Sequence, residues 1–185
     1  LIGLGLTGAA LAVLLAHSLF KAALFLVTGI VDKSTGTRDI SALRGLGRSL
    51  PLVATLGAVA ALSMAGVPPM LGFVTKEAAF DLLISEGRWV ALAVIAAASV
   101  LTVAYAAQWW FGAFATKDAA TAGSSEAKRP YAAMVAGPLV LAALTIAIGL
   151  FPEGLGVAIS DGVEQQVKLV LWPGFKPALA LSAVV

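Results

Sequence analysis

The chain has 185 residues, of which 60% are hydrophobic and only 12% are charged, and its mean hydropathy is +0.98. A water-soluble domain needs a charged exterior, so this composition argues against one and indicates a surface that faces lipid. The net charge of +2 is too balanced to favour a nucleic-acid partner, and the absence of cysteine excludes disulfides and cysteine-ligated metals.

Four stretches of the chain are long and apolar enough to cross a membrane as helices. The hydrocarbon core of a bilayer is about 30 Å thick and requires roughly 20 apolar residues in a helix. The stretches span residues 1–31, 51–84, 89–114 and 131–151. Their length and their content of alanine and leucine favour helices over strands. We therefore expect an all-α, polytopic bundle of transmembrane helices in a lipid bilayer.

The end of the chain has a different pattern. Between residues 155 and 172 apolar and polar side chains fall on opposite faces of a helix, which predicts an amphipathic helix. It could lie on the membrane surface or on a neighbouring subunit, and the sequence leaves both open. Residues 176–185 begin a further apolar run, and we expect the chain to be a piece of a longer protein. The apolar face comprises Ile159, Val163, Val167 and Leu171, and the polar face Asp161, Glu164, Gln165 and Lys168.

Basic residues are concentrated in two of the connections between these stretches. Residues 32–50 and 115–130 would lie on the same side of the membrane, and they carry more basic residues than the opposite side. The positive-inside rule makes both connections cytoplasmic, in what we expect to be a bacterial inner membrane. The cytoplasmic set is Lys33, Arg38, Arg44, Arg48, Lys117, Lys128 and Arg129, against Arg88, Lys168 and Lys176 on the other side.

His17 and Lys21 are four residues apart on one face of the first helix, so their side chains begin about 6 Å apart. Lys21 lies about 15 Å along the helix axis from the end of its stretch, near the middle of the membrane. A cation at that depth costs several kcal/mol unless it faces a polar interior. We interpret the pair as a proton relay. The alternative is a structural pair that hydrogen-bonds helix carbonyls.

The second stretch is interrupted after Gly66 by two consecutive prolines, Pro68 and Pro69. Proline lacks the backbone donor that a helix interior needs, so we predict a discontinuous helix over residues 51–84 that is broken at 66–69. In a membrane such a break is tolerated only where protein or water satisfies the freed carbonyls, and transporters build ion sites there.

Three ionisable residues follow the break. Lys76 and Glu77 come within two turns of it, and Asp81 lies one turn beyond Glu77 on the same face. We predict a switchable charge site from Lys76 and Glu77, with Asp81 as a secondary member. The alternative is that the prolines form a simple loop and that Lys76 and Glu77 begin an interfacial helix.

Asp32, Arg38 and Asp39 are interpreted as solvated loop charges that pair locally, with at most a secondary role in translocation. The chain contains one histidine and no cysteine, and no acidic residue clusters with the histidine. Catalytic triads, phosphate-binding loops and metal clusters are therefore not expected, and neither is a cofactor. An enzyme that acts on a small molecule is disfavoured.

Two motifs carry a resemblance to a known family. Residues 17–26, HSLFKAALFL, resemble the H-x-x-F-K-A-x-L-F-L helix of the antiporter-like subunits shared by respiratory complex I and Mrp-type antiporters. Residues 64–77, MAGVPPMLGFVTKE, resemble the discontinuous helix A-G-x-P-P-x-x-G-F-x-x-K-[DE] of the same family, whose lysine gates ion exit. Together the two motifs lie in the first half of the chain.

Weaker features resemble one branch of that family. Residues 32–40, DKSTGTRDI, look like the D-x-x-T-G-T-R-D loop of the large A subunit of Mrp antiporters. Residues 171–175, LWPGF, look like its L-W-H-G-F segment, although Pro173 replaces the histidine. The resemblance implies the C-terminal part of an inverted-repeat antiporter core, with other membrane subunits as partners. It also implies a line of buried groups that moves H⁺ in exchange for Na⁺, with His17 and Lys21 in the middle and Lys76 at the outlet.

Three functional hypotheses follow from the sequence. The first is part of a secondary antiporter subunit that exchanges Na⁺ for H⁺. The second is a proton-pumping, antiporter-like subunit of an NADH:quinone oxidoreductase, which would have redox partners. The third is a structural membrane scaffold whose ionisable residues only hydrogen-bond between helices.

Overall fold

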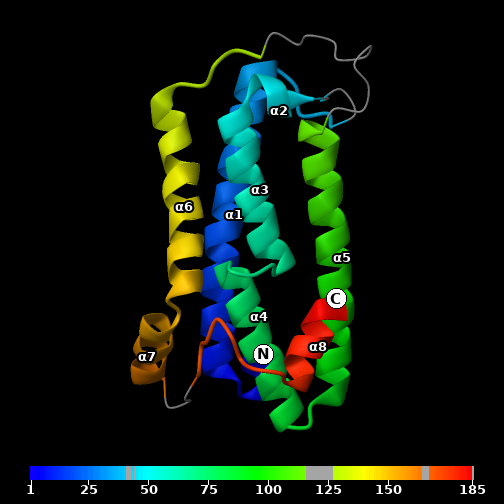
Figure 1. Ribbon diagram of the computed structural model, residues 1–185, viewed down its shortest axis with the longest axis vertical. Coiled ribbons are helices and arrows are strands. Elements are labelled where there is room, and N and C mark those ends of the chain that lie inside the picture. Colours follow the sequence, from blue (N-terminus) through cyan, green and yellow to red (C-terminus); the bar gives the residue numbers. More distant parts are fainter. Residues whose placement is uncertain (41–42, 44, 116–126, 164–166, 185) are drawn as a thin grey trace.

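The computed structural model describes residues 1–40, 43, 45–115, 127–163 and 167–184, and these residues form helices and no strand. Two of the basic residues expected on the cytoplasmic side, Arg44 and Lys117, lie outside the described residues. The elements in chain order are η1 Ile2–Leu4, α1 Thr7–Thr35, α2 Leu46–Ser49, α3 Pro51–Ala65, α4 Leu71–Ser85, α5 Trp89–Phe114, α6 Ala132–Leu150, α7 Glu153–Gly162 and α8 Pro177–Val184 (Figure 1).

Long helices lie side by side in an elongated bundle. Among the described helices, α1, α5 and α6 are each long and apolar enough to cross a membrane. Helices α3 and α4 follow one another along the bundle and together cover its length (Figure 1). The protein is thus an all-α transmembrane bundle with one discontinuous helix, as the sequence predicted.

Helix α1 is the centre of the bundle and packs against α3, α4 and α6. It begins at Thr7, after the 3-10 turn η1, and it ends at Thr35 rather than near residue 31. The predicted end is corrected because Gly36 is the first residue there that adopts a left-handed conformation, with φ of 75°, and its N–H caps the Asp32 carbonyl at 2.7 Å. The first residues of the predicted loop therefore form the last helical turn.

The C-terminal ends of α1 and α5 and the start of α2 lie at one end of the bundle (Figure 1). The backbone N–H of Lys128 donates to the Ser34 carbonyl at 3.0 Å, and that of Gly45 donates to the Ala115 carbonyl at 3.2 Å. The two connections that the positive-inside rule groups together are thus joined by hydrogen bonds. Their assignment to the cytoplasm stays a prediction.

The interruption between α3 and α4 is held against α6. The Ser63 hydroxyl in the last turn of α3 hydrogen-bonds the Thr145 hydroxyl of α6 at 2.8 Å, and both side chains are buried. Gly149 of α6 lies directly against the backbone of Pro69 and Leu71. Packing of this kind keeps the freed ends of the broken helix inside protein, as an apolar solvent requires.

The predicted amphipathic helix over residues 155–172 is corrected. Helix α7 ends at Gly162, and Val163 is already extended. Residues 167–171 are not helical. Val167 and Leu169 are buried and Lys168 between them is exposed, and this alternation is typical of an extended chain. This segment packs against Phe73 and Val74 of α4. Glu164 and Gln165, which the sequence places on the polar face, lie outside the described residues.

Candidate functional site

Lys21 is held by an aromatic residue from another helix. Its ammonium group donates a hydrogen bond to the Tyr105 hydroxyl of α5 and lies 4.9 Å from the centre of the tyrosine ring. The same hydroxyl donates to the sulfur of Met64, at 2.9 Å, in the last turn of α3. Lys21 is thereby connected through Tyr105 to the end of the first half of the broken helix. Lys21 thus makes both a charge-assisted hydrogen bond and a cation–π contact with this tyrosine.

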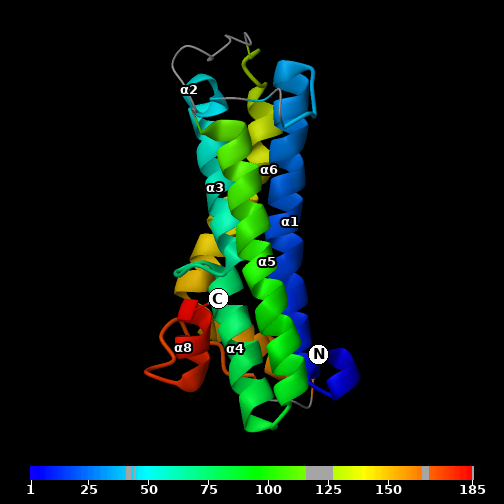
Figure 2. The ribbon, with the colours of Figure 1, turned by 90° about the vertical axis from the view of Figure 1, so that its right-hand side faces the viewer.

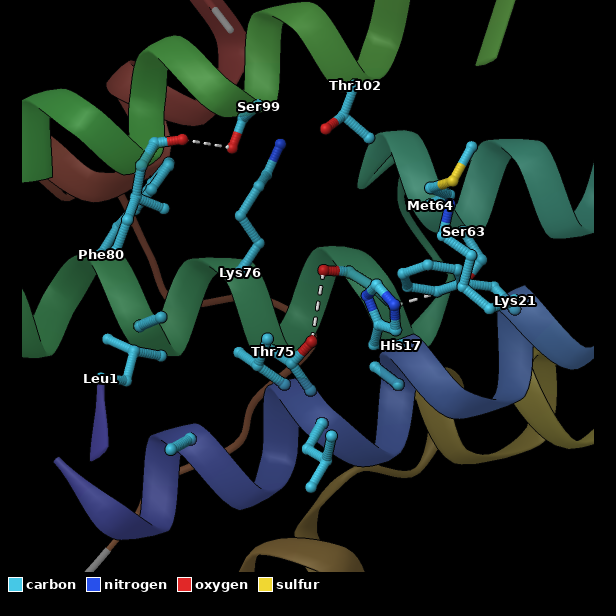
Figure 3. Close-up of a pocket in the computed structure, with 18 of the residues that line it drawn as sticks. Leu1, His17, Lys21, Ser63, Met64, Thr75, Lys76, Phe80, Ser99 and Thr102 are labelled. Atoms are coloured by element: carbon cyan, nitrogen blue, oxygen red, sulfur yellow. Dashed lines mark hydrogen bonds between the residues drawn. The ribbon is translucent and has the colours of Figure 1, made fainter. Parts of the chain in front are cut away.

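His17 lies one turn before Lys21 on α1. Its ring packs on Phe20, with the ring centres 5.2 Å apart, and its side chain is exposed at the surface of this chain. Both residues face the same cavity between α1, α4 and α5 (Figure 3). The structure therefore places the predicted pair on one wall of one cavity.

Lys76 extends from α4 into the same cavity. Its side chain is half-buried and points away from α4 toward Ser99 and Thr102 of α5 (Figure 3). Its ammonium nitrogen lies 3.4 Å from the Ala65 carbonyl at the C-terminal end of α3. The unsatisfied carbonyls at a helix C-terminus carry partial negative charge, so the break supplies an attractive environment for the ammonium group.

Gly66 makes this position of Lys76 possible. Its φ of 77° lies in the left-handed region, and a Cβ atom there would lie 2.7 Å from both the ammonium nitrogen and the adjacent carbon of Lys76. Gly66 thus accommodates Lys76 in two ways. Its left-handed backbone ends α3, and it has no side chain that would overlap the end of Lys76.

Glu77 follows Lys76 on α4 but is not among the residues on the walls of the cavity that holds His17 and Lys21, and a charge site built from Lys76 and Glu77 stays a prediction. Successive residues on a helix point about 100° apart, and Glu77 faces α8. Its side chain is 3% exposed, and one carboxylate oxygen accepts a hydrogen bond from Ser182 at 2.5 Å. The other oxygen, Oε1, is buried without a hydrogen-bond partner among the described residues.

Asp81 lies near Glu77 on α4 but pairs with a different residue. Its carboxylate forms an ion pair with Lys176, at 2.7 Å, just before α8. Both side chains are close to half exposed, at 47% and 46%. Asp81 therefore fastens the segment before α8 and is absent from the walls of the cavity that Lys76 faces.

The loop charges lie at the other end of the bundle. Arg38 pairs with Asp32 at 2.8 Å, and the backbone N–H of Asp39 donates to the Thr37 hydroxyl at 3.1 Å. These residues close the end of α1 and do not line the cavities beside Lys76. Among the described residues, no group of three histidine, cysteine, aspartate or glutamate side chains could hold a metal ion.

The main cavity has a volume of about 790 Å³. Hydroxyl groups from α5 line it opposite the two lysines, and the sequence interpretation missed them. Ser99, Thr102 and Tyr105 recur every third residue, so they fall along one side of α5. This spacing within an otherwise apolar stretch was a signal that could have identified them. The polar groups on the walls include His17, Lys21, Lys76, Ser99, Thr102 and Tyr105.

Comparison with known proteins matches this arrangement to membrane transporters. Residues 1–102 match the family model described as "NADH:quinone oxidoreductase/Mrp antiporter, TM". The chain is 34% identical to the A1 subunit of a Na⁺/H⁺ antiporter from Staphylococcus epidermidis over 89% of its length, which is 23% of that relative. It is 32% identical to the A subunit of a Na⁺/H⁺ antiporter from Alkalihalophilus pseudofirmus, over 91% of its length and 24% of the relative.

A solved structure shares the fold. The Mrp complex from Dietzia sp. DQ12-45-1b contains a chain that superposes with a TM-score of 0.81 and 35% sequence identity. The superposition covers 96% of this chain and 20% of the other. The chain thus spans about a quarter of the length of the curated relatives it matches.

Proposed function

Because the chain belongs to the NADH:quinone oxidoreductase/Mrp antiporter family, we propose that it forms part of the proton-translocating core of a Na⁺/H⁺ antiporter. The relatives named as A and A1 subunits, and the Mrp complex of similar structure, support the large A type for the whole protein. The protein is an integral membrane protein. Its bacterial relatives support the cytoplasmic membrane as its location and other membrane subunits as its partners.

The observation that carries the proposal is the single cavity shared by His17, Lys21 and Lys76. Buried cations in a transmembrane bundle are costly, and they persist where they line a hydrated pathway. The cavity lies beside a helix break, and ion sites of transporters are built at such breaks. Its volume and its hydroxyl-bearing wall suit a chain of water molecules that joins the two lysines.

In the proposed mechanism each lysine alternately holds and releases a proton. The Lys21 ammonium group donates to Tyr105, and the Lys76 ammonium group donates to the Ala65 carbonyl at the end of α3. A proton passes from the Lys21 ammonium to water in the cavity, and a proton from that water chain protonates the Lys76 amine, so one N–H bond breaks as another forms. His17, one turn from Lys21, supplies protons to the cavity from its exposed side.

The proposal is tested by replacing Lys76 with alanine in the full antiporter complex. We expect exchange of Na⁺ for H⁺ in membrane vesicles to be lost while the complex still assembles. Lys33→Ala is the matched control, because Lys33 is an exposed lysine in the last turn of α1. Unchanged exchange in Lys76→Ala would contradict the proposal and favour a scaffold, and co-purification with quinone-reducing activity would favour the redox-driven alternative.

A further inference from the structure

The last turn of α3 is in contact with both lysine sites of the main cavity. Helix α3 ends partway along the bundle, where α4 continues it (Figure 2). The Met64 sulfur accepts a hydrogen bond from the Tyr105 hydroxyl, which itself accepts one from Lys21. The carbonyl of Ala65, the next residue along the chain, accepts one from the Lys76 ammonium group at 3.4 Å. A shift of this one turn would therefore change the surroundings of both ammonium groups.

Ser63, in the same turn, is held by α6. Its hydroxyl lies 2.8 Å from the Thr145 hydroxyl, either of the two can donate, and the side chains are 0% and 1% exposed. The Ser63 hydroxyl also accepts a bond from the backbone N–H of Gly72, in the first turn of α4, at 3.4 Å. A buried hydroxyl without a partner is costly, so the pair gives the last turn of α3 one preferred position against α6.

The surrounding backbone is fitted closely to the same position. A Cβ atom at Gly72 would lie 1.7 Å from the Ser63 carbonyl oxygen, and one at Gly149 of α6 would lie 2.2 Å from the Pro69 carbonyl oxygen. Helix α4 thus meets the turn, and α6 meets the helix break, with no side chain in between. In such close packing a small displacement of the turn is not absorbed by rearranged side chains.

The bond between Lys76 and the Ala65 carbonyl depends most on the position of the turn. Hydrogen bonds from nitrogen to oxygen are usually about 2.7–3.2 Å long, and this one is already 3.4 Å. If the turn moved a few tenths of an ångström farther from α4, the ammonium group would lose this acceptor. The contact that holds the turn against α6 therefore matters for the lysine on α4.

We infer that Thr145 is a positioning residue for proton translocation, because its bond to Ser63 sets the position of the turn that contacts both lysine sites. The inference rests on the proposed function and adds a residue to it. Thr145 does not line the main cavity, so it acts through the turn and not on the proton itself. It also lies beyond the 1–102 match to the family model, on a helix that this match does not include.

The inference is tested by removing the Thr145 hydroxyl in the full complex. Thr145→Val keeps the shape of the side chain, and we expect the exchange rate per assembled complex to fall by about fivefold or more. Thr145→Ser keeps the hydroxyl and should restore the rate to within about twofold. Thr55→Val is the control, because Thr55 is exposed and bonds only its own helix at the Pro51 carbonyl. An unmodified rate in Thr145→Val, or no rescue by Thr145→Ser, would overturn the inference.

A double-mutant cycle tests whether Thr145 acts through the shared turn. In Thr145→Val the turn that carries Met64 is already displaced, so the further removal of the Tyr105 hydroxyl should cost less than it does alone. We expect the double variant Thr145→Val/Tyr105→Phe to lose clearly less exchange than the product of the two single losses. Losses that simply multiply would mean that the two residues act independently and would contradict the role of the turn.

Two further variants keep the test decisive. Ser63→Ala removes the same pair from the side of α3 if Thr145→Val fails to assemble, and Ser85→Ala is its control, because Ser85 is exposed and bonds its own helix at the Leu82 carbonyl. Lys76→Ala separates the two proposals. Loss of exchange in Lys76→Ala with a normal rate in Thr145→Val would overturn this inference alone, whereas normal exchange in both would overturn the proposed function as well.

Discussion

The ammonium group of Lys21 on α1 donates a hydrogen bond to the hydroxyl of Tyr105 on α5. The same hydroxyl donates to the sulfur of Met64 on α3. The bond joins three helices at one polar group in an otherwise apolar bundle. A hydrogen bond to a charged group is stronger than one between neutral groups, so the Tyr105 hydroxyl helps to hold the Lys21 side chain at this position.

Tyr105→Phe removes this hydroxyl and keeps the ring. Hydrogen bonds to charged groups contribute about 1.5–3 kcal/mol, so we expect the exchange rate in vesicles to fall by about tenfold or more. The ring remains over the ammonium group, so the complex should still assemble. Tyr131→Phe is the control, because Tyr131 is an exposed residue before α6. A Tyr105→Phe complex with the unmodified rate would show that the hydroxyl has no part in translocation.

Gly66→Ala tests whether the end of α3 is shaped for Lys76. Alanine at a φ of 77° is strained by about 1–2 kcal/mol, and its methyl group would displace the end of the Lys76 side chain. We expect a lower melting temperature of the purified complex and a strong loss of exchange.

Gly174→Ala separates these two effects. Gly174 has a similar φ of 81°, but a Cβ atom there meets nothing within 4 Å. The strain should therefore lower stability to a similar degree in both variants, while exchange stays near normal in Gly174→Ala. If both variants lost exchange equally, backbone strain rather than displacement of Lys76 would be the cause.

The sequence predicted the membrane bundle and the discontinuous helix because the bilayer leaves few alternatives. An apolar run of about 20 residues in lipid must satisfy its backbone internally, and two adjacent prolines prevent that in one place. For the same reason Lys21 could be selected as a candidate from its depth in the membrane, and Lys76 from its position after the helix break. Whether they carry the proton remains a proposal.

The partners of these residues could not be predicted, because they depend on how the helices pack. Tyr105 lies 84 positions from Lys21 in the chain, and Ser182 lies 105 positions from Glu77. The different partners of Lys76 and Glu77, the Ala65 carbonyl and the Ser182 hydroxyl, likewise could not be read from two adjacent positions in the sequence. The amphipathic pattern over 155–172 forms a helix only as far as Gly162, and the described residues 167–169 alternate between buried and exposed side chains.

Asp81→Asn should have little effect, in contrast to substitutions at Glu77. The ion pair with Lys176 is close to half exposed on both sides, and pairs of this kind contribute less than about 1 kcal/mol. We expect exchange within about fivefold of the unmodified complex, which is the largest change that such an energy allows. Glu77→Gln places an amide in a fully buried site and serves as the sensitive comparison. A complete loss of exchange in Asp81→Asn would make its carboxylate part of the pathway.

Gly72→Ala tests how closely the two halves of the broken helix approach. A Cβ atom at Gly72 would overlap the backbone carbonyl of Ser63, and Ser63 is fixed by its bond to Thr145 of α6. Overpacking against a backbone that cannot move costs about 1–3 kcal/mol or more, so we expect poor assembly of the complex at growth temperature.

Gly29→Ala is the matched control for this substitution. Gly29 is also in a long helix, but a Cβ atom there meets nothing within 4 Å, and alanine is the better helix former by about 1 kcal/mol. The melting temperature of the purified complex should therefore fall for Gly72→Ala and stay level or rise for Gly29→Ala. Normal assembly of Gly72→Ala would mean that the ends of α3 and α4 can separate, and the position of Lys76 at the Ala65 carbonyl would then not be fixed by the break.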